Sequence, residues 1–208
     1  GLARAADALR GYPRQTAVLL SVELCTLTLQ REDLSVANII STGLFGDGAA
    51  AVVLRGAEAG RAPPGPGVVA SESVFYPGTE DMMGWDFVDT GFKVVLSAKV
   101  PELVRGNIRN DVDRFLEKHG LGRRDIKHWA IHTGGPKVLE AFEAALELPE
   151  QALRPSWESL ERTGNLSSAS VLFVLREHLV RAEAKPGDFG LLAAMGPGFC
   201  AELVLLRW

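Results

Sequence analysis

The chain has 208 residues, of which 47% are hydrophobic and 23% are charged, so we expect one or two domains with a sizeable buried core. A formal net charge of −4 argues against a surface that neutralises phosphates, and therefore against nucleic acid as the main partner. Two cysteines are too few for a disulfide framework, which favours a reducing, cytoplasmic setting, and no apolar run has membrane-spanning length.

The N-terminal stretch GLARAADALRGYPRQ carries its apolar residues at helical spacing, which predicts a helix. It has no start methionine and no helix cap, so we expect the chain to open inside a helix and further residues to precede Gly1. The continuous apolar run over 16–24 predicts a buried strand, and a glycine-rich turn leads into a second strand over 49–54. The proline- and glycine-rich stretch over 56–67 predicts a surface linker.

Strands and helices alternate after this linker, which favours a layered α/β fold with helices that cover a mixed sheet. The linker divides the chain into an incomplete first part, residues 1–60, and a complete α/β unit, residues 61–208. In chain order, the second part is expected to hold strands at 67–78 and 91–97, a helix at 100–120, a strand at 128–135, helices at 136–148 and 168–180, and strands at 189–196 and 200–208.

Two polar residues stand out in the second part. His132 is expected at the end of a buried strand and is followed by two glycines; ligands bind at such strand ends, although a histidine bonded only to backbone is the common alternative. Asn165 precedes an apolar helix, where its amide can donate to a ligand oxygen or simply cap the helix. Neither residue type decides between a catalytic and a structural role.

The remaining motifs favour structural roles or exclude particular chemistries. GLFGDG, over 43–48, lacks the Lys-Ser/Thr of a phosphate loop and leads into a strand, so a turn is the better interpretation, although Phe45 could line a cavity. No metal-ligand spacing is present, and no G-x-S-x-G elbow. His119, His128 and His178 lie among charged residues and are expected to be solvated.

Taken together and in order, several stretches resemble the type III polyketide synthases, the chalcone-synthase-like branch of the thiolase superfamily. They are most similar to the bacterial members of this family. The stretches are VELCTLTLQ, LFGDGAAAVV, GFKVVLSAKVP, HTGGPKVLEA, GNLSSASVLFVL and GPGFCAELVLL. The resemblance implies a thiolase-like αβαβα fold, here the end of the N-terminal half followed by the whole C-terminal half. It also implies a homodimeric acyltransferase that uses coenzyme A thioesters as substrates, with no metal or redox cofactor.

The resemblance assigns roles to particular residues. His132 and Asn165 match the catalytic histidine and asparagine, whereas the nucleophilic cysteine is expected about six residues before Gly1, because neither cysteine of this sequence lies in its motif. Phe45 matches a gatekeeping phenylalanine, and Val94 stands where an aromatic gatekeeper is common. Positions that line the family's substrate cavity correspond here to Cys25, Thr28, Trp85, Phe92 and Ser167, with Gly196, Pro197 and Gly198 in the loop that shapes its floor.

The implied reaction is the decarboxylative condensation of malonyl-CoA onto an acyl-CoA starter, followed by cyclisation. The slim side chains of Cys25 and Val94 favour long-chain starters and products of the alkylpyrone or alkylresorcinol type. A malonyl-primed synthase of the tetrahydroxynaphthalene type is the alternative, since Trp85 could crowd the cavity. A ketoacyl synthase of the fatty-acid type and a non-enzymatic dimer partner are further alternatives.

Overall fold

The computed structural model describes residues 1–61 and 65–208. Within the expected linker, residues 62–64 lie outside the described residues, so the prediction of a linker is not tested there. Among the described residues, no helix combines the length and the apolar character that crossing a membrane requires.

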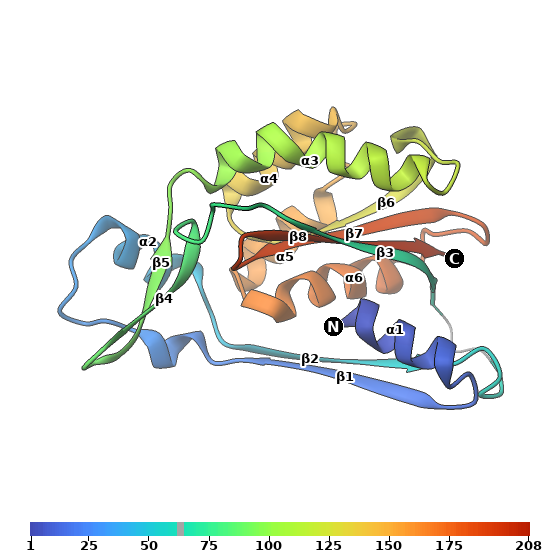
Figure 1. Ribbon diagram of the computed structural model, residues 1–208, viewed down its shortest axis with the longest axis horizontal. Helices are drawn as coiled ribbons and strands as arrows, with labels where there is room; N and C mark the ends of the chain where they lie inside the picture. Colours follow the sequence, from blue (N-terminus) through green and yellow to red (C-terminus); the bar gives the residue numbers. More distant parts are fainter. Residues whose placement is uncertain (62–64) are drawn as a thin grey trace.

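The described elements stack in layers (Figure 1). Helices α3 (Val100–Glu117) and α4 (Pro136–Leu146) cover one face of the main sheet, and helices α1 (Leu2–Gly11) and α6 (Ser170–Arg181) lie on its other side. Beyond α1 and α6 runs an antiparallel ribbon of β1 (Thr16–Glu23) and β2 (Gly48–Arg55). The layered α/β fold predicted from the sequence is therefore confirmed.

The main sheet is mixed, as the sequence indicates. Its strand order is β3 (Gly67–Phe75), β8 (Cys200–Arg207), β7 (Phe189–Gly196) and β6 (Ile126–Ile131). Strands β6 and β7 run parallel, whereas β8 is antiparallel to both of its neighbours. The C-terminal end of β6, where His132 follows, therefore lies beside the end of β7 that leads into the Gly196–Gly198 turn.

An apolar cluster fills the space on each face of this sheet. Between the sheet and helices α3 and α4, Ile108, Phe115 and Phe142 are almost wholly buried. On the other face, Val174 of α6 packs with Leu192 and the partly buried side chains of the β1–β2 ribbon. Burying each large apolar side chain contributes roughly 1.5–3 kcal/mol, so these clusters hold the layers together and fix where each strand ends.

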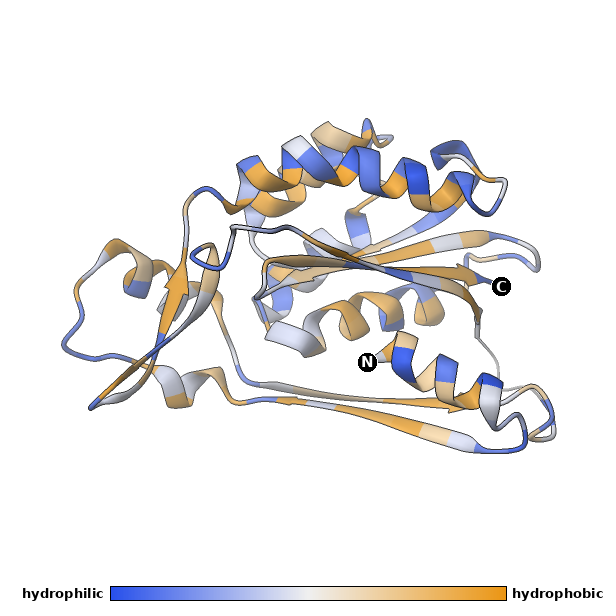
Figure 2. Ribbon diagram, viewed as in Figure 1, coloured by the Kyte–Doolittle hydropathy of each residue, from blue (hydrophilic) through white to orange (hydrophobic). Residues whose placement is uncertain are grey.

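The prediction of a buried strand over 16–24 holds for only one of its two faces. One face of β1 joins the cluster with α6, but Val18, Leu20 and Val22 on the other face are 59%, 69% and 65% exposed. Buried and exposed side chains alternate along β1 because successive residues of a strand point to opposite faces. No described element covers the second face. Figure 2 shows the resulting apolar colouring along the ribbon.

The structure also contains elements that the sequence pattern did not predict. Helix α2 (Val36–Leu44) is capped by Ser35, whose Oγ accepts a hydrogen bond from the backbone N–H of Asn38 at 3.3 Å. Helix α5 (Arg154–Thr163) ends just before Gly164. Strand β4 (Met83–Val88) pairs with β5 (Gly91–Leu96) in a hairpin apart from the main sheet. Short 3-10 turns complete the elements: η1 (Cys25–Thr28), η2 (Arg123–Asp125) and η3 (Ser167–Ala169).

The expectation that His178 is solvated is wrong. It lies on the face of α6 that packs against the sheet and is only 8% exposed. Its Nε2 lies 3.2 Å from the carbonyl oxygen of Trp129, and the His128 ring packs against it with centroids 5.6 Å apart. Burial, followed by the nearby His128, lowers the pKa of His178, so this histidine is neutral at pH 7.

Candidate active site

Three loops from distant parts of the chain meet beside the end of β6. The backbone N–H of Asn165 donates to the carbonyl oxygen of Leu44 at 2.8 Å, and the N–H of Gly46 donates to the carbonyl oxygen of Asn165 at 3.0 Å. Thr133, which follows His132, donates from Oγ1 to the carbonyl oxygen of Gly164 at 3.4 Å. The loops that carry His132, Phe45 and Asn165 are thus in direct contact through residues next to these three.

Gly164 makes the contact between two of these loops possible. Its φ of +69° lies in the left-handed region, which side chains disfavour. A Cβ at this position would lie 2.6 Å from the carbonyl oxygen of Leu44, which is the acceptor for Asn165. The glycine is therefore required both by backbone conformation and by space.

The side chain of Asn165 is held at its oxygen end. The residue is 3% exposed, and its Oδ1 accepts hydrogen bonds from the backbone N–H of Ser167 at 2.9 Å and from the Ser170 hydroxyl at 3.3 Å. It is not the N-cap of the following helix, because η3 intervenes and α6 begins only at Ser170. Its Nδ2 makes no hydrogen bond with the described residues, so the amide N–H groups stay available to a ligand.

His132 continues the strand ladder beyond β6. Its backbone N–H donates to the carbonyl oxygen of Ala193 at 2.9 Å, which fixes the start of the glycine-containing loop. The residue is half-buried; although solvent reaches part of it, the surrounding protein lowers the pKa of the imidazole from 6.5 to about 4 by desolvation. A neutral imidazole carries one N–H donor, which suits it to stabilise negative charge on a bound oxygen.

Predicted cavity residues from the N-terminal part lie beside the Phe45 loop. Phe45 directly follows α2 and is half-buried, and Cys25 and Thr28 belong to turn η1. The neighbouring Thr26 donates to the Asp47 carboxylate from its N–H at 2.8 Å and its hydroxyl at 2.7 Å, which ties η1 to this loop. Burial, with the charges of Glu23 and Asp47, raises the pKa of Cys25, so this thiol is protonated and poorly suited as a nucleophile.

Of the other predicted cavity residues, Ser167 begins turn η3 next to Asn165, and the rest belong to two hairpins. Val94 lies opposite Trp85 in the β4–β5 register, and the rings of Trp85 and Phe92 meet edge to face with centroids 6.0 Å apart. The turn of Gly196, Pro197 and Gly198 joins β7 to β8. Phe199, which follows this turn, accepts a hydrogen bond from the N–H of Tyr76 at 3.0 Å and donates its own N–H to Thr79 Oγ1 at 3.0 Å. Among the described residues, no hydrogen bond or ring–ring contact joins Trp85 or Phe92 to His132, so their cavity roles stay predictions.

A second set of polar contacts, which sequence reasoning missed, ties η3 to β1. Ser168 donates to Glu23 Oε1 both from its backbone N–H, at 3.3 Å, and from its hydroxyl, and its Oγ lies 2.6 Å from Ser21 Oγ. Glu23 is half-buried. The cluster of serines in GNLSSAS was the available signal, but their partners are more than 140 positions away in the sequence.

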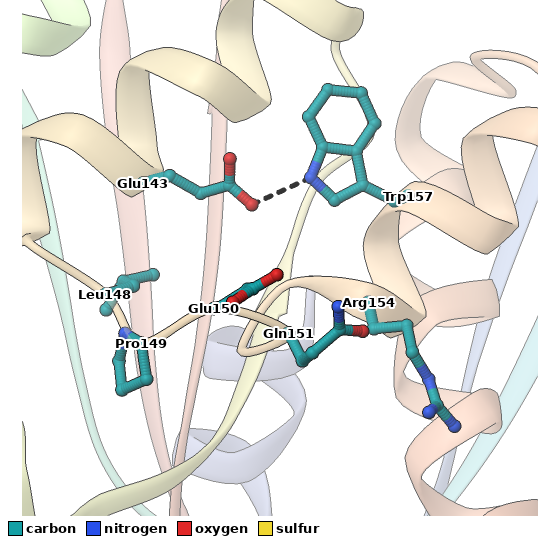
Figure 3. A pocket seen from close by; sticks show the side chains of 7 residues that line it. All are labelled: Glu143, Leu148, Pro149, Glu150, Gln151, Arg154 and Trp157. Carbon is teal, nitrogen blue, oxygen red and sulfur yellow. Dashed lines mark hydrogen bonds between the residues drawn. The ribbon is translucent and has the colours of Figure 1, made fainter.

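Two cavities lie away from the three loops. One, of about 540 Å³, opens between α4 and α5, where Trp157 donates from Nε1 to Glu143 Oε1 at 2.8 Å (Figure 3). The other lies between β2 and α6. Within the described ranges, no group of three or more His, Cys, Asp or Glu side chains is arranged to hold a metal ion.

Comparison with solved structures defines the class of the protein. The chain superposes with a TM-score of 0.93 and 35% sequence identity on the crystal structure of 1,3,6,8-tetrahydroxynaphthalene synthase from Streptomyces coelicolor, described as a bacterial type III polyketide synthase; the match covers 100% of this chain and 58% of that one. The fold is therefore the thiolase-like α/β fold that the resemblance implied.

Sequence comparisons then define the family. The model of the C-terminal domain of chalcone and stilbene synthases matches residues 67–208. A 1,3,6,8-tetrahydroxynaphthalene synthase of Streptomyces peucetius subsp. caesius is 56% identical over 209 residues, covering 100% of this chain and 55% of that protein. A putative chalcone synthase of Bacillus subtilis is 42% identical over 212 residues, covering 100% of this chain and 58% of that protein. The chain belongs to the chalcone and stilbene synthase family, the type III polyketide synthases, and spans a little over half the length of these relatives.

Proposed function

We propose that the full-length protein is a malonyl-primed type III polyketide synthase that forms a tetrahydroxynaphthalene-type product. The observation that carries the proposal is the meeting of the His132 and Asn165 loops, through the Thr133–Gly164 hydrogen bond of 3.4 Å. The high identity to the Streptomyces peucetius relative supports the choice of product, and favours it over the long-chain products expected from Cys25 and Val94.

The proposed chemistry assigns the two polar residues a common task. When malonyl-CoA loses carbon dioxide, the electrons of the broken C–C bond form an enolate whose negative charge lies on the thioester oxygen. The unpaired Nδ2–H groups of Asn165 and the N–H of a neutral His132 donate to that oxygen. The arrangement stabilises charge that develops only during the reaction, which is where stabilisation accelerates a step.

The growing chain is proposed to sit on a cysteine thiolate, which the resemblance places before Gly1. The enolate carbon attacks the acyl carbonyl on that sulfur, a C–C bond forms, and the C–S bond breaks to release the thiolate. The lengthened chain leaves on coenzyme A and returns to the cysteine by thioester exchange. Cys25 is not assigned this role, because burial raises the pKa of its thiol.

The test is product formation from malonyl-CoA alone. The purified full-length protein, given carbon-labelled malonyl-CoA, is expected to release labelled carbon dioxide and to form an aromatic naphthalene-type product, identified by mass spectrometry. Adding hexanoyl-, lauroyl- or palmitoyl-CoA is expected to change the product little. A product that requires a long-chain starter would favour an alkylpyrone or alkylresorcinol synthase instead, and a single extension would indicate a ketoacyl synthase.

We also propose that the full-length protein is a homodimer, as the family resemblance implies. The described residues include strongly exposed apolar side chains, among them Leu27, Leu34 and Phe87 at 78%, 83% and 80%. Surfaces of this kind mark contacts with other protein segments, either of the same polypeptide or of a second copy. Light scattering of the full-length protein at micromolar concentration is expected to give twice the monomer mass; a monomer mass would contradict the proposal.

A further inference from the structure

The direction of the Asn165 amide decides whether the residue can act as proposed. An asparagine side chain has a donor end and an acceptor end of almost the same shape. With Nδ2 facing the reacting oxygen the amide stabilises an enolate, whereas with Oδ1 facing it the two negative oxygens repel each other. The protein therefore needs a device that keeps the oxygen end turned away from the substrate.

Ser170 is placed to provide that device. It is 1% exposed and begins helix α6, five positions after Asn165. Its Oγ accepts a hydrogen bond of 2.7 Å from the backbone N–H of Leu166, which occupies one side of the hydroxyl. The hydroxyl proton is then free to point to Asn165 Oδ1, 3.3 Å away. No other acceptor for that proton is found among the described residues.

A reversed amide would lose both of its contacts at this end. The Ser167 N–H, now 2.9 Å from Oδ1, would face an N–H group instead, and two donors would oppose each other. The Ser170 hydroxyl would lose its acceptor inside a buried site, which is unfavourable because an unsatisfied buried polar group retains its desolvation cost. The two contacts thus favour the same orientation, one from the backbone and one from a side chain.

We propose that Ser170 is a positioning residue that fixes the orientation of the Asn165 amide, so that Nδ2 faces the thioester oxygen. This inference rests on the proposed function and adds to it a residue that touches no substrate. It predicts a specific signature: substitution of Ser170 lowers the rate of decarboxylation through Asn165 alone, and leaves the binding of malonyl-CoA unchanged.

A double-mutant cycle in the full-length protein tests this signature. We expect Ser170→Ala to lower kcat for malonyl-CoA decarboxylation by about 3- to 10-fold, the equivalent of one neutral hydrogen bond, with KM unchanged. In an Asn165→Ala background the same substitution is expected to have no further effect, because the group it positions is gone. Ser170→Cys, which keeps the size and a weak donor, is expected to restore part of the rate.

Ser156→Ala is the matched control for loss of a buried hydroxyl. Ser156 is wholly buried and, like Ser170, its hydroxyl both accepts and donates: it accepts from the N–H of Ile131 at 3.3 Å and donates to the carbonyl oxygen of Ile131 at 2.8 Å. Ile131 is also held in the sheet by its pairing with Ala193. We expect a similar loss of Tm for Ser156→Ala and Ser170→Ala, and a fall in kcat only for the latter.

The outcomes separate this inference from the proposed function. If Asn165→Ala leaves decarboxylation unchanged, the proposed function fails and the inference fails with it. If Asn165→Ala strongly lowers the activity but Ser170→Ala does not lower kcat, or lowers the residual rate of Asn165→Ala by the same factor as the wild-type rate, only the role of Ser170 is overturned. Should Ser170→Ala not fold, the same cycle with Ser170→Cys decides, since full additivity with Asn165→Ala would likewise contradict the proposal.

Discussion

Phe45 and Asn165 form an isolated parallel β-bridge, although 120 positions separate them in the sequence (165 − 45). The hydrogen bonds of the bridge join Asn165 to Leu44 and to Gly46, on either side of the phenylalanine. The gatekeeper predicted for the cavity and the predicted amide donor therefore share one piece of backbone. A shift of one loop would displace both residues, so we expect access to the cavity and the chemistry to be coupled at this point.

Replacing Gly164 is expected to break that link. A methyl group in Gly164→Ala would lie 2.6 Å from the Leu44 carbonyl oxygen, and the φ of +69° already disfavours a side chain. Strain of this kind costs on the order of 1–3 kcal/mol. We expect a lower Tm and a loss of decarboxylation larger than the loss of stability explains, measured by thermal unfolding and by carbon dioxide release from the full-length protein.

Gly106→Ala is the matched control for Gly164→Ala. Gly106 lies in α3, where a Cβ would meet nothing within 4 Å. Alanine in place of an exposed helical glycine is expected to raise stability by roughly 0.5–1 kcal/mol and to leave the activity as it is. Normal turnover in Gly164→Ala would show that the bridge does not position Asn165.

The proposed role of His132 predicts a difference between two of its substitutions. His132→Ala removes the N–H donor, and loss of such a donor lowers the rate by roughly 100- to 1000-fold. His132→Gln keeps an N–H group and is expected to regain part of that loss. Carbon dioxide release from malonyl-CoA is the measurement, with His119→Gln on the surface as the control; equal rates for wild type and His132→Ala would remove His132 from the mechanism.

The buried histidine His178 predicts that stability falls with acidification. Its pKa is lowered in the folded state, first by burial, so between the normal value of 6.5 and the lowered one the unfolded chain binds a proton that the folded chain does not. The free energy of unfolding is therefore unaffected by His178 above that window. It declines as pH falls through the window, by at most about 1.4 kcal/mol per pH unit for one group.

Urea unfolding at pH 7.5 and pH 5 measures this dependence. His178→Gln keeps a donor for the Trp129 carbonyl but does not titrate, so its stability is expected to change less between the two pH values. The same argument applies to His132, whose pKa is lowered to about 4, and a His132→Gln variant provides an independent comparison. Identical pH dependence in wild type and His178→Gln would show that the buried ring does not govern acid sensitivity.

The size of the side chain at position 94 is expected to limit the length of the polyketide product. It lies opposite Trp85 in the hairpin, at a position where the resemblance expects an aromatic residue. Val94→Phe is expected to narrow the passage and shift the products to fewer extensions, because a well-packed site does not absorb the added volume. The measurement is the mass distribution of products from malonyl-CoA. Val95→Phe, on the opposite face of the strand, is the control, and an equal shift from both variants would contradict a lining role for Val94.

The sequence predicted those elements whose apolar pattern is continuous or periodic. Strands β1, β2, β7 and β8 are long apolar runs, and α3 repeats its apolar residues at helical spacing. Helices α2 and α5 were missed because SVANIISTGL mixes in serine, threonine and glycine and RPSWESLERT is largely polar; the only cues were Ser35 as a cap and the positions of Pro155 and Gly164. The burial of His178 could have been predicted, because it follows Val174 and Leu175 by four and three positions and therefore shares their helix face.

The residues of the candidate site could likewise be predicted only in part. The resemblance nominated His132, Asn165 and Phe45 as site residues, because short motifs carry them, and their functional roles stay predictions. The contacts of Ser168 and Ser170 could not be inferred, since a serine offers the same hydroxyl to many partners and only the fold selects one. The exposure of one face of β1 could not be predicted either, because an apolar sequence does not show whether one or both faces of the strand are covered.

The bond between Asn165 and Leu44 also has a consequence for how the chain folds. It closes a loop of 121 positions (165 − 44), and the Ser168–Glu23 contact closes one of 145. Closing long loops costs chain entropy before any contact is gained, so pairings of this kind form late. The helices and hairpins, with their short-range contacts, can assemble first. We therefore expect the three loops of the candidate site to be among the last parts to order during folding. A partly folded chain is expected to lack the assembled candidate site even when most of its secondary structure is present.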